Sequence, residues 1–174
     1  MLDNLSDIFQ RGLEYAWDSE HVLLKHLARM SAAATSTELK QALDLHLIET
    51  KGHIYRIEQI FTRLDRSPAA EKNEPVRVLV SECEKAIRHI ERSSLLDAEL
   101  IFCGNQIEQY ETGLYESLVG FALTLGLEEI AGLLDEVLGQ ERECAHHLLR
   151  LAKSSINRAA SSVQNARTFA LIQG

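Results

Sequence analysis

The sequence has few of the residues on which small extracellular domains and β-sheet proteins depend. Its 174 residues include three cysteines, two prolines and only 6% aromatics. Cys83, Cys103 and Cys144 are odd in number, far apart and outside any C-x-x-C pattern, so we expect neither a disulfide framework nor a zinc knuckle. With 45% hydrophobic and 25% charged residues, the composition is typical of an all-helical globular protein.

Two kinds of long run are also missing. No basic stretch is long enough to follow a phosphate backbone, and the net charge of −8 argues against a nucleic-acid partner. No run of about eighteen apolar residues occurs, and the opening residues, MLDNLSDIFQRG, lack the basic and apolar regions of a secretory signal. We therefore expect no membrane partner and a cytoplasmic location.

The sequence does contain apolar residues at spacings of three and four, the pattern of amphipathic helices. The spacing predicts four long helices: from Asn4 or Ser6 to about Ala34, from about Ser36 to Asp65, from about Leu95 to Leu125, and from just after Gly126 to about Asn157. Thr35 and Glu38 have capping-box spacing, and Gly126 suits a left-handed helix end. The short turns make the helices of each pair antiparallel neighbours, which predicts an all-α four-helix bundle.

A linker and a shorter helix separate the two helical pairs. Ser67-Pro68 disfavours continued helix, and the residues up to Pro75 are polar. Region 66–92 is therefore predicted to be a linker followed by a short crossover helix from Val76 to about Ile90. We assign residues 1–157 to one bundle domain and residues 158–174 to a C-terminal tail, either a short helix or disordered.

Ionisable residues interrupt the apolar stripes of all four long helices. The segment 43–64 carries His46, Glu49 and His53 on its inward stripe. The other three long helices carry carboxylates at core-facing spacing, namely Glu20, the pair Glu108 and Glu111, and Glu141. Burying such groups without partners costs several kcal/mol. The pattern therefore indicates that these side chains share a partner inside the bundle.

A pair of metal ions is the partner that fits these residue types. Dinuclear centres in helical bundles use a Glu from each of two helices and a Glu-x-x-His pair from each of the others. The five carboxylates could not all ionise in a dry core, but two divalent ions would nearly neutralise them. The sequence thus predicts a metal site with the candidate ligands Glu20, His46, Glu49, His53, Glu108, Glu111 and Glu141.

Each of these residues has a simpler interpretation when it is taken alone. A single Glu on the flank of a helix usually extends to water, so the prediction depends on the joint pattern. Glu143-x-x-His146 has ligand spacing but projects onto the polar face, and we interpret the pair as solvated. The remaining histidines are interpreted as surface or rim residues: His21, His26, His89 and His147.

Four short motifs carry a resemblance to a known family. They are Ala16-Trp17-Asp18-Ser19-Glu20, His46-Leu47-Ile48-Glu49-Thr50, Ile107-Glu108-Gln109-Tyr110-Glu111 and Leu138-Gly139-Gln140-Glu141-Arg142. Through them the chain resembles the YciE/YciF-type ferritin-like stress proteins over roughly residues 4–157. The resemblance implies a ferritin-like bundle with an extra helix, a homodimer, and a rubrerythrin-like centre with two divalent metal ions, iron or manganese. Family members have Asp where Ala145 stands, so we expect the second metal position to be the weaker.

The pattern of apolar residues also favours a homodimer. The long helices contain more apolar positions than one buried face needs, including Leu45, Leu47, Ile54 and Phe61. Self-association would cover the surplus.

Three functions are compatible with these features. The first is redox chemistry on a small oxidant, peroxide or dioxygen, with Tyr15, Tyr55, Tyr110 or Tyr115 able to quench stray radicals. The alternative is a non-catalytic helical interaction or structural module with a vestigial metal site. The third, iron storage, needs a hollow multi-subunit shell that nothing in the sequence indicates. No nucleophile-base triad or phosphate loop occurs, so no catalytic residue is assigned.

Overall fold

The computed structural model describes residues 2–162. Its helices are α1 (Leu5–Ala33), α2 (Thr37–Arg63), α3 (Glu74–His89), α4 (Ser94–Thr124) and α5 (Glu128–Leu151), followed by a π-helical turn, η1 (Ala152–Ile156). No strand occurs within these described residues. The predicted all-α bundle with a crossover helix is therefore confirmed.

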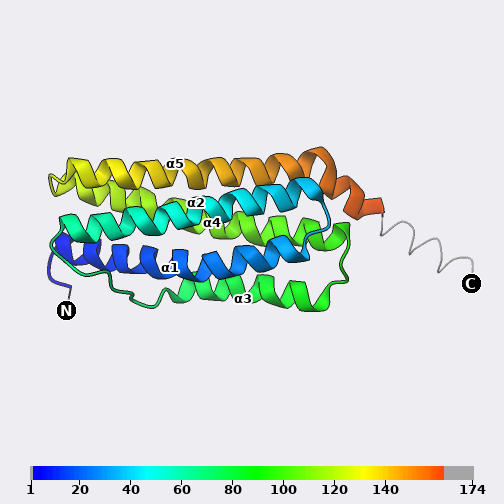
Figure 1. Cartoon of the computed structure of the whole chain (residues 1–174), viewed down its shortest axis with the longest axis horizontal. Coiled ribbons are helices and arrows are strands. Elements are labelled where there is room, and N and C mark those ends of the chain that lie inside the picture. The colour runs from blue at the N-terminus through cyan, green and yellow to red at the C-terminus, as the bar shows by residue number, and fades with distance from the viewer. Residues whose placement is uncertain (1, 163–174) are drawn as a thin grey trace, which may run out of the picture.

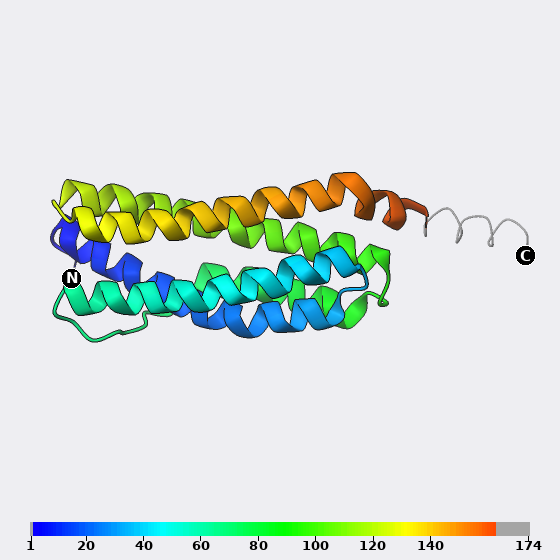
Figure 2. The ribbon, with the colours of Figure 1, turned by 45° about the horizontal axis from the view of Figure 1, so that its top comes forward.

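The four long helices lie side by side along one axis. α1 and α5 run in one direction and α2 and α4 in the other, because α3 carries the chain back along the bundle before α4 begins (Figure 1). α1 and α5 each pack against both α2 and α4, which closes the bundle (Figure 2). One long crossover between two antiparallel pairs is the topology of ferritin-like bundles.

The turn between α1 and α2 differs in detail from the prediction. Ser36, not Thr35, caps α2, since its hydroxyl accepts a hydrogen bond from the backbone N–H of Leu39 at 3.3 Å. The Thr35 hydroxyl instead donates to Asp97 of α4 at 2.5 Å. Asp97 also accepts the backbone N–H groups of Thr35 and Ser36 at 2.7 and 2.9 Å. A carboxylate distant in sequence therefore displaced the local capping box.

Two other predicted helix ends are confirmed. The Asn4 side chain caps α1 by accepting the Asp7 backbone N–H at 3.0 Å. Gly126, between α4 and α5, has a φ of 72°, which glycine adopts without steric cost. Both ends thus follow from local sequence.

Two large apolar clusters form most of the core, with a polar layer between them, and a smaller cluster of Leu23, Val76 and Ile107 lies where α3 packs on α1 and α4. The first apolar cluster includes Phe9, Leu13, Ile57, Phe61, Tyr115, Leu118 and Leu134. The second apolar cluster includes Leu27, Met30, Leu39, Leu43, Leu100, Ile101 and Leu148. Phe61 is only 1% exposed, so the expectation that it is available for a dimer interface is wrong. In every long helix the predicted ligands fall between the two clusters.

α3 packs on the outside of α1 and α4, and a buried residue anchors its start. Asn73, the N-cap of α3, is fully buried. Its backbone N–H donates to Asp18 at 2.9 Å and its side-chain nitrogen donates to Ser19 at 2.8 Å. Its side-chain oxygen accepts from the Tyr110 hydroxyl at 2.8 Å. Asp18 pairs further with Arg77 of α3 at 2.5 Å, so one polar cluster joins three helices.

Asn73→Ala should lower the free energy of unfolding by about 2 to 3 kcal/mol, because it removes a helix cap and leaves the buried Ser19 hydroxyl and the half-buried Tyr110 hydroxyl without their partner. Urea unfolding followed by circular dichroism measures this. Lys72→Ala, one residue earlier and exposed, is the control and should change stability by less than about 0.5 kcal/mol. Equal effects of the two substitutions would contradict the anchoring role.

A second anchor of α3 corrects one prediction from the sequence. His26 was expected at the surface or rim, but it is buried, and its Nδ1 lies 3.0 Å from a carboxylate oxygen of Glu84 on α3. Burial lowers the pKa of His26 against the opposing effect of Glu84. Arg29 pairs with the same carboxylate at 2.5 Å. The inward position of His26 became clear only once α3 was seen to cover α1.

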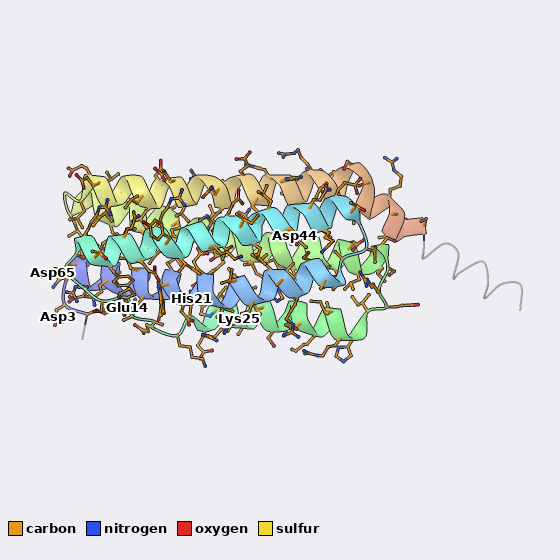
Figure 3. The ribbon with its side chains drawn as sticks, in the orientation of Figure 1. Asp3, Glu14, His21, Lys25, Asp44 and Asp65 are labelled. Atoms are coloured by element: carbon orange, nitrogen blue, oxygen red, sulfur yellow. The ribbon has the colours of Figure 1, made fainter. Side chains whose placement is uncertain are left out.

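The described chain ends in a helix that extends beyond the predicted bundle domain. Helix continues through residue 162, so the first residues of the predicted tail are helical, while residues 163–174 lie outside the described part. None of the described helices is long and apolar enough to cross a membrane. The exposed carboxylates Asp3, Asp44 and Asp65 are labelled in Figure 3, and they contrast with the buried carboxylates of the polar layer.

Candidate metal centre

The polar layer gathers buried ionisable side chains from all four long helices. Between 0 and 2% of the surface of each of these residues is exposed: Glu20 on α1, His46 and His53 on α2, Glu108 and Glu111 on α4, and Glu141 on α5. The four helices thus bring together six of the seven residues predicted as ligands. The seventh, Glu49, lies at the rim with a quarter of its side chain exposed.

One group of possible ligands consists of Glu20, His53 and Glu141. Nδ1 of His53 lies 3.0 Å from a Glu141 oxygen and 3.4 Å from a Glu20 oxygen. The other ring nitrogen, Nε2, lies 3.1 Å from the side-chain oxygen of Gln140, which can only accept a hydrogen bond. Gln140 therefore holds a proton on Nε2 and leaves Nδ1 facing the two carboxylates, the arrangement that orients histidine ligands of metals.

A second group consists of His46, Glu108 and Cys144, with one possible ligand atom from each residue within 4.8 Å of the others. Nε2 of His46 lies 3.2 Å from a Glu108 oxygen. Its Nδ1 points towards the rim, 3.4 Å from a Glu49 oxygen. Glu49 thus faces the ring nitrogen that points away from Glu108.

Glu141 lies between the two groups. One of its oxygens is 3.0 Å from Nδ1 of His53, and the other is 3.6 Å from Nε2 of His46. The centres of the two imidazole rings are 6.3 Å apart. A carboxylate with one oxygen directed at each of two neighbouring nitrogen donors has the geometry of a bridging ligand.

Many buried carboxylate oxygens in this layer have no hydrogen-bond donor. Among the described residues, no hydrogen-bond partner is found for either oxygen of Glu111, either oxygen of Glu141, or one oxygen each of Glu20 and Glu108. The Tyr115 hydroxyl donates to the other Glu20 oxygen at 2.5 Å. Buried oxygens that lack donors are costly unless a cation or a proton neutralises them.

Burial and neighbouring charges favour the protonated forms of several groups in this layer. Burial raises the pKa of Glu141 to about 8 despite the lowering effect of His53. Burial, together with the charges of Glu141, Glu20 and Glu108, raises the pKa of Glu111 well above its usual range. Burial alone would lower the pKa of His53, but Glu20 and Glu141 raise it to about 10.

The donor set of the layer fits two divalent metal ions. Imidazole nitrogens and carboxylate oxygens are the ligands that iron and manganese take in helical bundles, and each group here offers one imidazole. The unpartnered oxygens of Glu108, Glu111 and Glu141 supply negative charge where two such ions would lie.

A small cavity of about 150 Å³ leads from the surface to this layer. Its walls include His46, Glu49 and Cys144, together with Glu143 and His147 nearer the outside. The volume admits a metal ion, water or a small oxidant but is below the 300 to 1,000 Å³ of typical drug-sized ligand sites. The His53 group is not among the residues that line this cavity.

Several predictions about single residues can be judged from their positions. Glu143 and His146 are exposed, as expected of a solvated pair. Tyr115 was one of four tyrosines considered, and it alone contacts a predicted ligand at the layer, whereas Tyr55 is largely exposed. Cys144 was not among the predicted ligands, but its sulfur lies close to His46 and Glu108; its spacing of three residues after Glu141 is the signal in the sequence that could have identified it.

Comparisons with known proteins support the predicted resemblance. A family model described as Domain of unknown function (DUF892) matches residues 4–161. Protein YciF from Escherichia coli (strain K12) is 30% identical over 162 residues, which are 92% of this chain and 98% of YciF. The crystal structure of the E. coli stress protein YciF matches with a TM-score of 0.85 over 89% of this chain and 98% of that chain.

Two further solved structures share the architecture. YcfI, a candidate structural protein from Rhodopseudomonas palustris, has a TM-score of 0.81 at 28% identity and covers 84% of this chain and 94% of its own. A protein from Xanthomonas campestris pv. campestris has a TM-score of 0.75 over 92% of this chain and 99% of its own. At 20% identity this last match concerns the fold alone.

Proposed function

This chain belongs to the DUF892 family, with the E. coli stress protein YciF among its relatives, and we propose that it is a dinuclear metal protein acting on peroxide or dioxygen. The metal ions would be iron or manganese. One observation carries the proposal: two imidazoles and four carboxylates are buried in one layer, and most of the carboxylate oxygens lack hydrogen-bond donors. We place this activity in the cytoplasm.

The groups around each imidazole would form the two proposed metal positions. Glu20, His53 and Glu141 would hold one ion, and His46 with Glu108 would hold the other. Glu141 would bridge them, since its two oxygens face different histidines. Glu111 lies in the same layer with both oxygens unpartnered and would complete the coordination.

Three residues orient the ligands. Gln140 holds the Nε2 proton of His53, and Glu49 is placed to hold the Nδ1 proton of His46, so in each ring the other nitrogen is free for metal. Tyr115 donates a hydrogen bond to Glu20 and fixes its second oxygen. Glu49 was predicted as a direct ligand, and its place at the rim favours this orienting role.

The chain controls access and protons at the proposed site. Two bound ions of iron or manganese would supply changes of redox state and open positions for a small oxidant. The two apolar clusters exclude water above and below the layer, and the cavity beside His46 admits only small molecules. His53 and Glu141, with raised pKa values, would release protons when metal binds.

Metal analysis of protein purified without chelators tests the proposal. We expect about two divalent metal ions per chain, with iron or manganese among them, anomalous scattering at the corresponding absorption edge inside the polar layer, and consumption of added peroxide by the loaded protein. Protein treated with a chelator is the control and should lose the peroxide consumption. Protein that binds neither metal after incubation with excess Fe²⁺ or Mn²⁺ would refute the dinuclear site.

The alternative is a non-catalytic helical interaction or structural module with a vestigial site. The description of the relative YcfI as a candidate structural protein favours it. This alternative would be supported if the loaded protein binds two ions but leaves peroxide and dioxygen untouched. A particle of a dozen or more subunits in sedimentation would instead point to iron storage.

We also propose a homodimer formed through the outer face of α2. Leu45, Ile48 and Tyr55 are 52, 63 and 62% exposed, and their spacing places them along one side of this helix. Light scattering should report a dimer for the native chain, and Ile48→Lys should shift it towards monomer, because a buried lysine charge is costly. Lys85→Ala, on the exposed side of α3, which packs on α1 and α4, is the control. A native chain that is monomeric at all concentrations would refute the dimer.

A further inference from the structure

The α5 helix departs from the usual ligand pattern of dinuclear bundles at one residue. Such bundles place His three residues after a Glu on two of their helices. On α5 the residue three positions after Glu141 is Cys144. A sulfur atom therefore stands where an imidazole would complete the second metal position.

The surroundings of this sulfur are those of a metal position. The sulfur of Cys144, a ring nitrogen of His46 and a carboxylate oxygen of Glu108 all lie within 4.8 Å of one another. Glu108 is 98% buried, and its second oxygen has no hydrogen-bond partner among the described residues. The same is true of both oxygens of Glu141, one of which faces His46. Buried carboxylate oxygens that lack hydrogen-bond donors beside the thiol favour the binding of a cation at this position.

We propose that Cys144 is a metal ligand and that, with His46 and Glu108, it forms a position selective for a softer divalent ion such as zinc or cobalt over manganese. The inference rests on the proposed dinuclear site and makes that site unsymmetrical. The reason is chemical: thiolate ligands favour zinc-like ions, whereas the imidazole and carboxylates of the Glu20, His53 and Glu141 group suit harder ions such as iron and manganese.

Binding of the divalent ion to Cys144 requires no further reactant. The divalent ion forms a bond to the Cys144 sulfur, the S–H bond breaks, and the proton leaves to water. The small cavity lined by Cys144 and His46 gives both the ion and the proton a path to solvent. Glu49 lines the same path and would attract the incoming cation.

Titration of the metal-free full chain with Co²⁺ tests the inference, because a cobalt–thiolate bond gives a strong near-ultraviolet charge-transfer band. We expect this band to rise in the native chain and to saturate at about one Co²⁺ per chain. Cys144→Ser should lose the band and keep the weaker visible bands of bound cobalt. Its dissociation constant for zinc should rise at least about tenfold, while manganese affinity stays within about twofold.

Two further variants show whether the loss of the cobalt–thiolate band is specific to Cys144. Cys103→Ser, which changes a cysteine of the second apolar cluster, is the matched control and should keep the band. Cys144→His, which restores the Glu-x-x-His spacing, should lose the band but retain tight binding and shift the preference towards iron or manganese.

The outcomes separate the two proposals. Cobalt bound by the native chain without the thiolate band, or a band that persists in Cys144→Ser, would overturn the role of Cys144 and leave the dinuclear site standing. A native chain that binds no cobalt, iron or manganese would overturn both.

Discussion

Glu141→Gln should abolish tight binding of both metal ions, with dissociation constants raised about 100-fold or more at each position. Glu141 is fully buried and directs one oxygen towards His53 at 3.0 Å and the other towards His46 at 3.6 Å. An amide keeps the shape of the side chain but loses its charge and one of its two acceptors. The expected loss exceeds the 10- to 100-fold typical of groups that only orient ligands.

Calorimetric titration with Mn²⁺ or Fe²⁺ under anaerobic conditions measures the effect, and unfolding experiments provide a second readout. Metal at 100 times its dissociation constant should stabilise the native chain by about 2.7 kcal/mol for each occupied position and the variant hardly at all. Glu143→Gln, an exposed carboxylate two residues further on α5, is the matched control and should bind like the native chain. Two metal ions bound by Glu141→Gln with native affinity would show that Glu141 does not bridge the positions.

Without metal, the same substitution should stabilise the protein, and the gain should grow as the pH rises from 5 to 8. Burial raises the pKa of Glu141 from 4.5 to about 8. Between those values the unfolded chain has released this proton and the folded chain keeps it, so the free energy of unfolding falls with increasing pH. Each pKa unit is worth about 1.4 kcal/mol, so the gain at pH 8 should reach several kcal/mol.

His53, Glu111 and His26 also make the free energy of unfolding of the metal-free chain depend on pH. The pKa of His53 rises to about 10, so its contribution to stability is complete below about 6.5 and is lost as the pH rises through 10. The raised pKa of Glu111 likewise makes the free energy of unfolding fall as the pH rises. Burial lowers the pKa of His26, so this residue makes the free energy of unfolding decrease as the pH falls below 6.5.

The difference between the variant and the native chain isolates Glu141 from these other groups. Urea unfolding of chelator-treated protein at several pH values between 5 and 8 gives that difference, with Glu143→Gln as a control that should show no trend. If Glu141→Gln and the native chain keep a constant difference across this range, the Glu141 carboxyl is ionised in the folded protein. In that case the cost of burying the Glu141 charge would not explain why the polar layer binds metal.

Much of the architecture could be predicted from the sequence because helix formation is a local property. The spacing of apolar residues gave the long helices to within a few residues, and Asn4 and Gly126 marked two of their ends. Glu20, His46, His53, Glu108, Glu111 and Glu141 stood out for the same reason, since each occupies an apolar stripe and is buried in the structure.

The tertiary structure alone decided which of these residues meet, because periodicity gives the face of a helix but not its shift along a neighbour. The sequence placed His46 and His53 together on the inward stripe of one predicted helix, yet they belong to different groups, with Glu141 between them. Asp97 displaced a local capping box, and Glu84 on the crossover helix made His26 a buried residue. The packing of α5 beside α2 and α4 brings the Cys144 sulfur close to His46 and Glu108, a proximity that its spacing after Glu141 does not determine by itself.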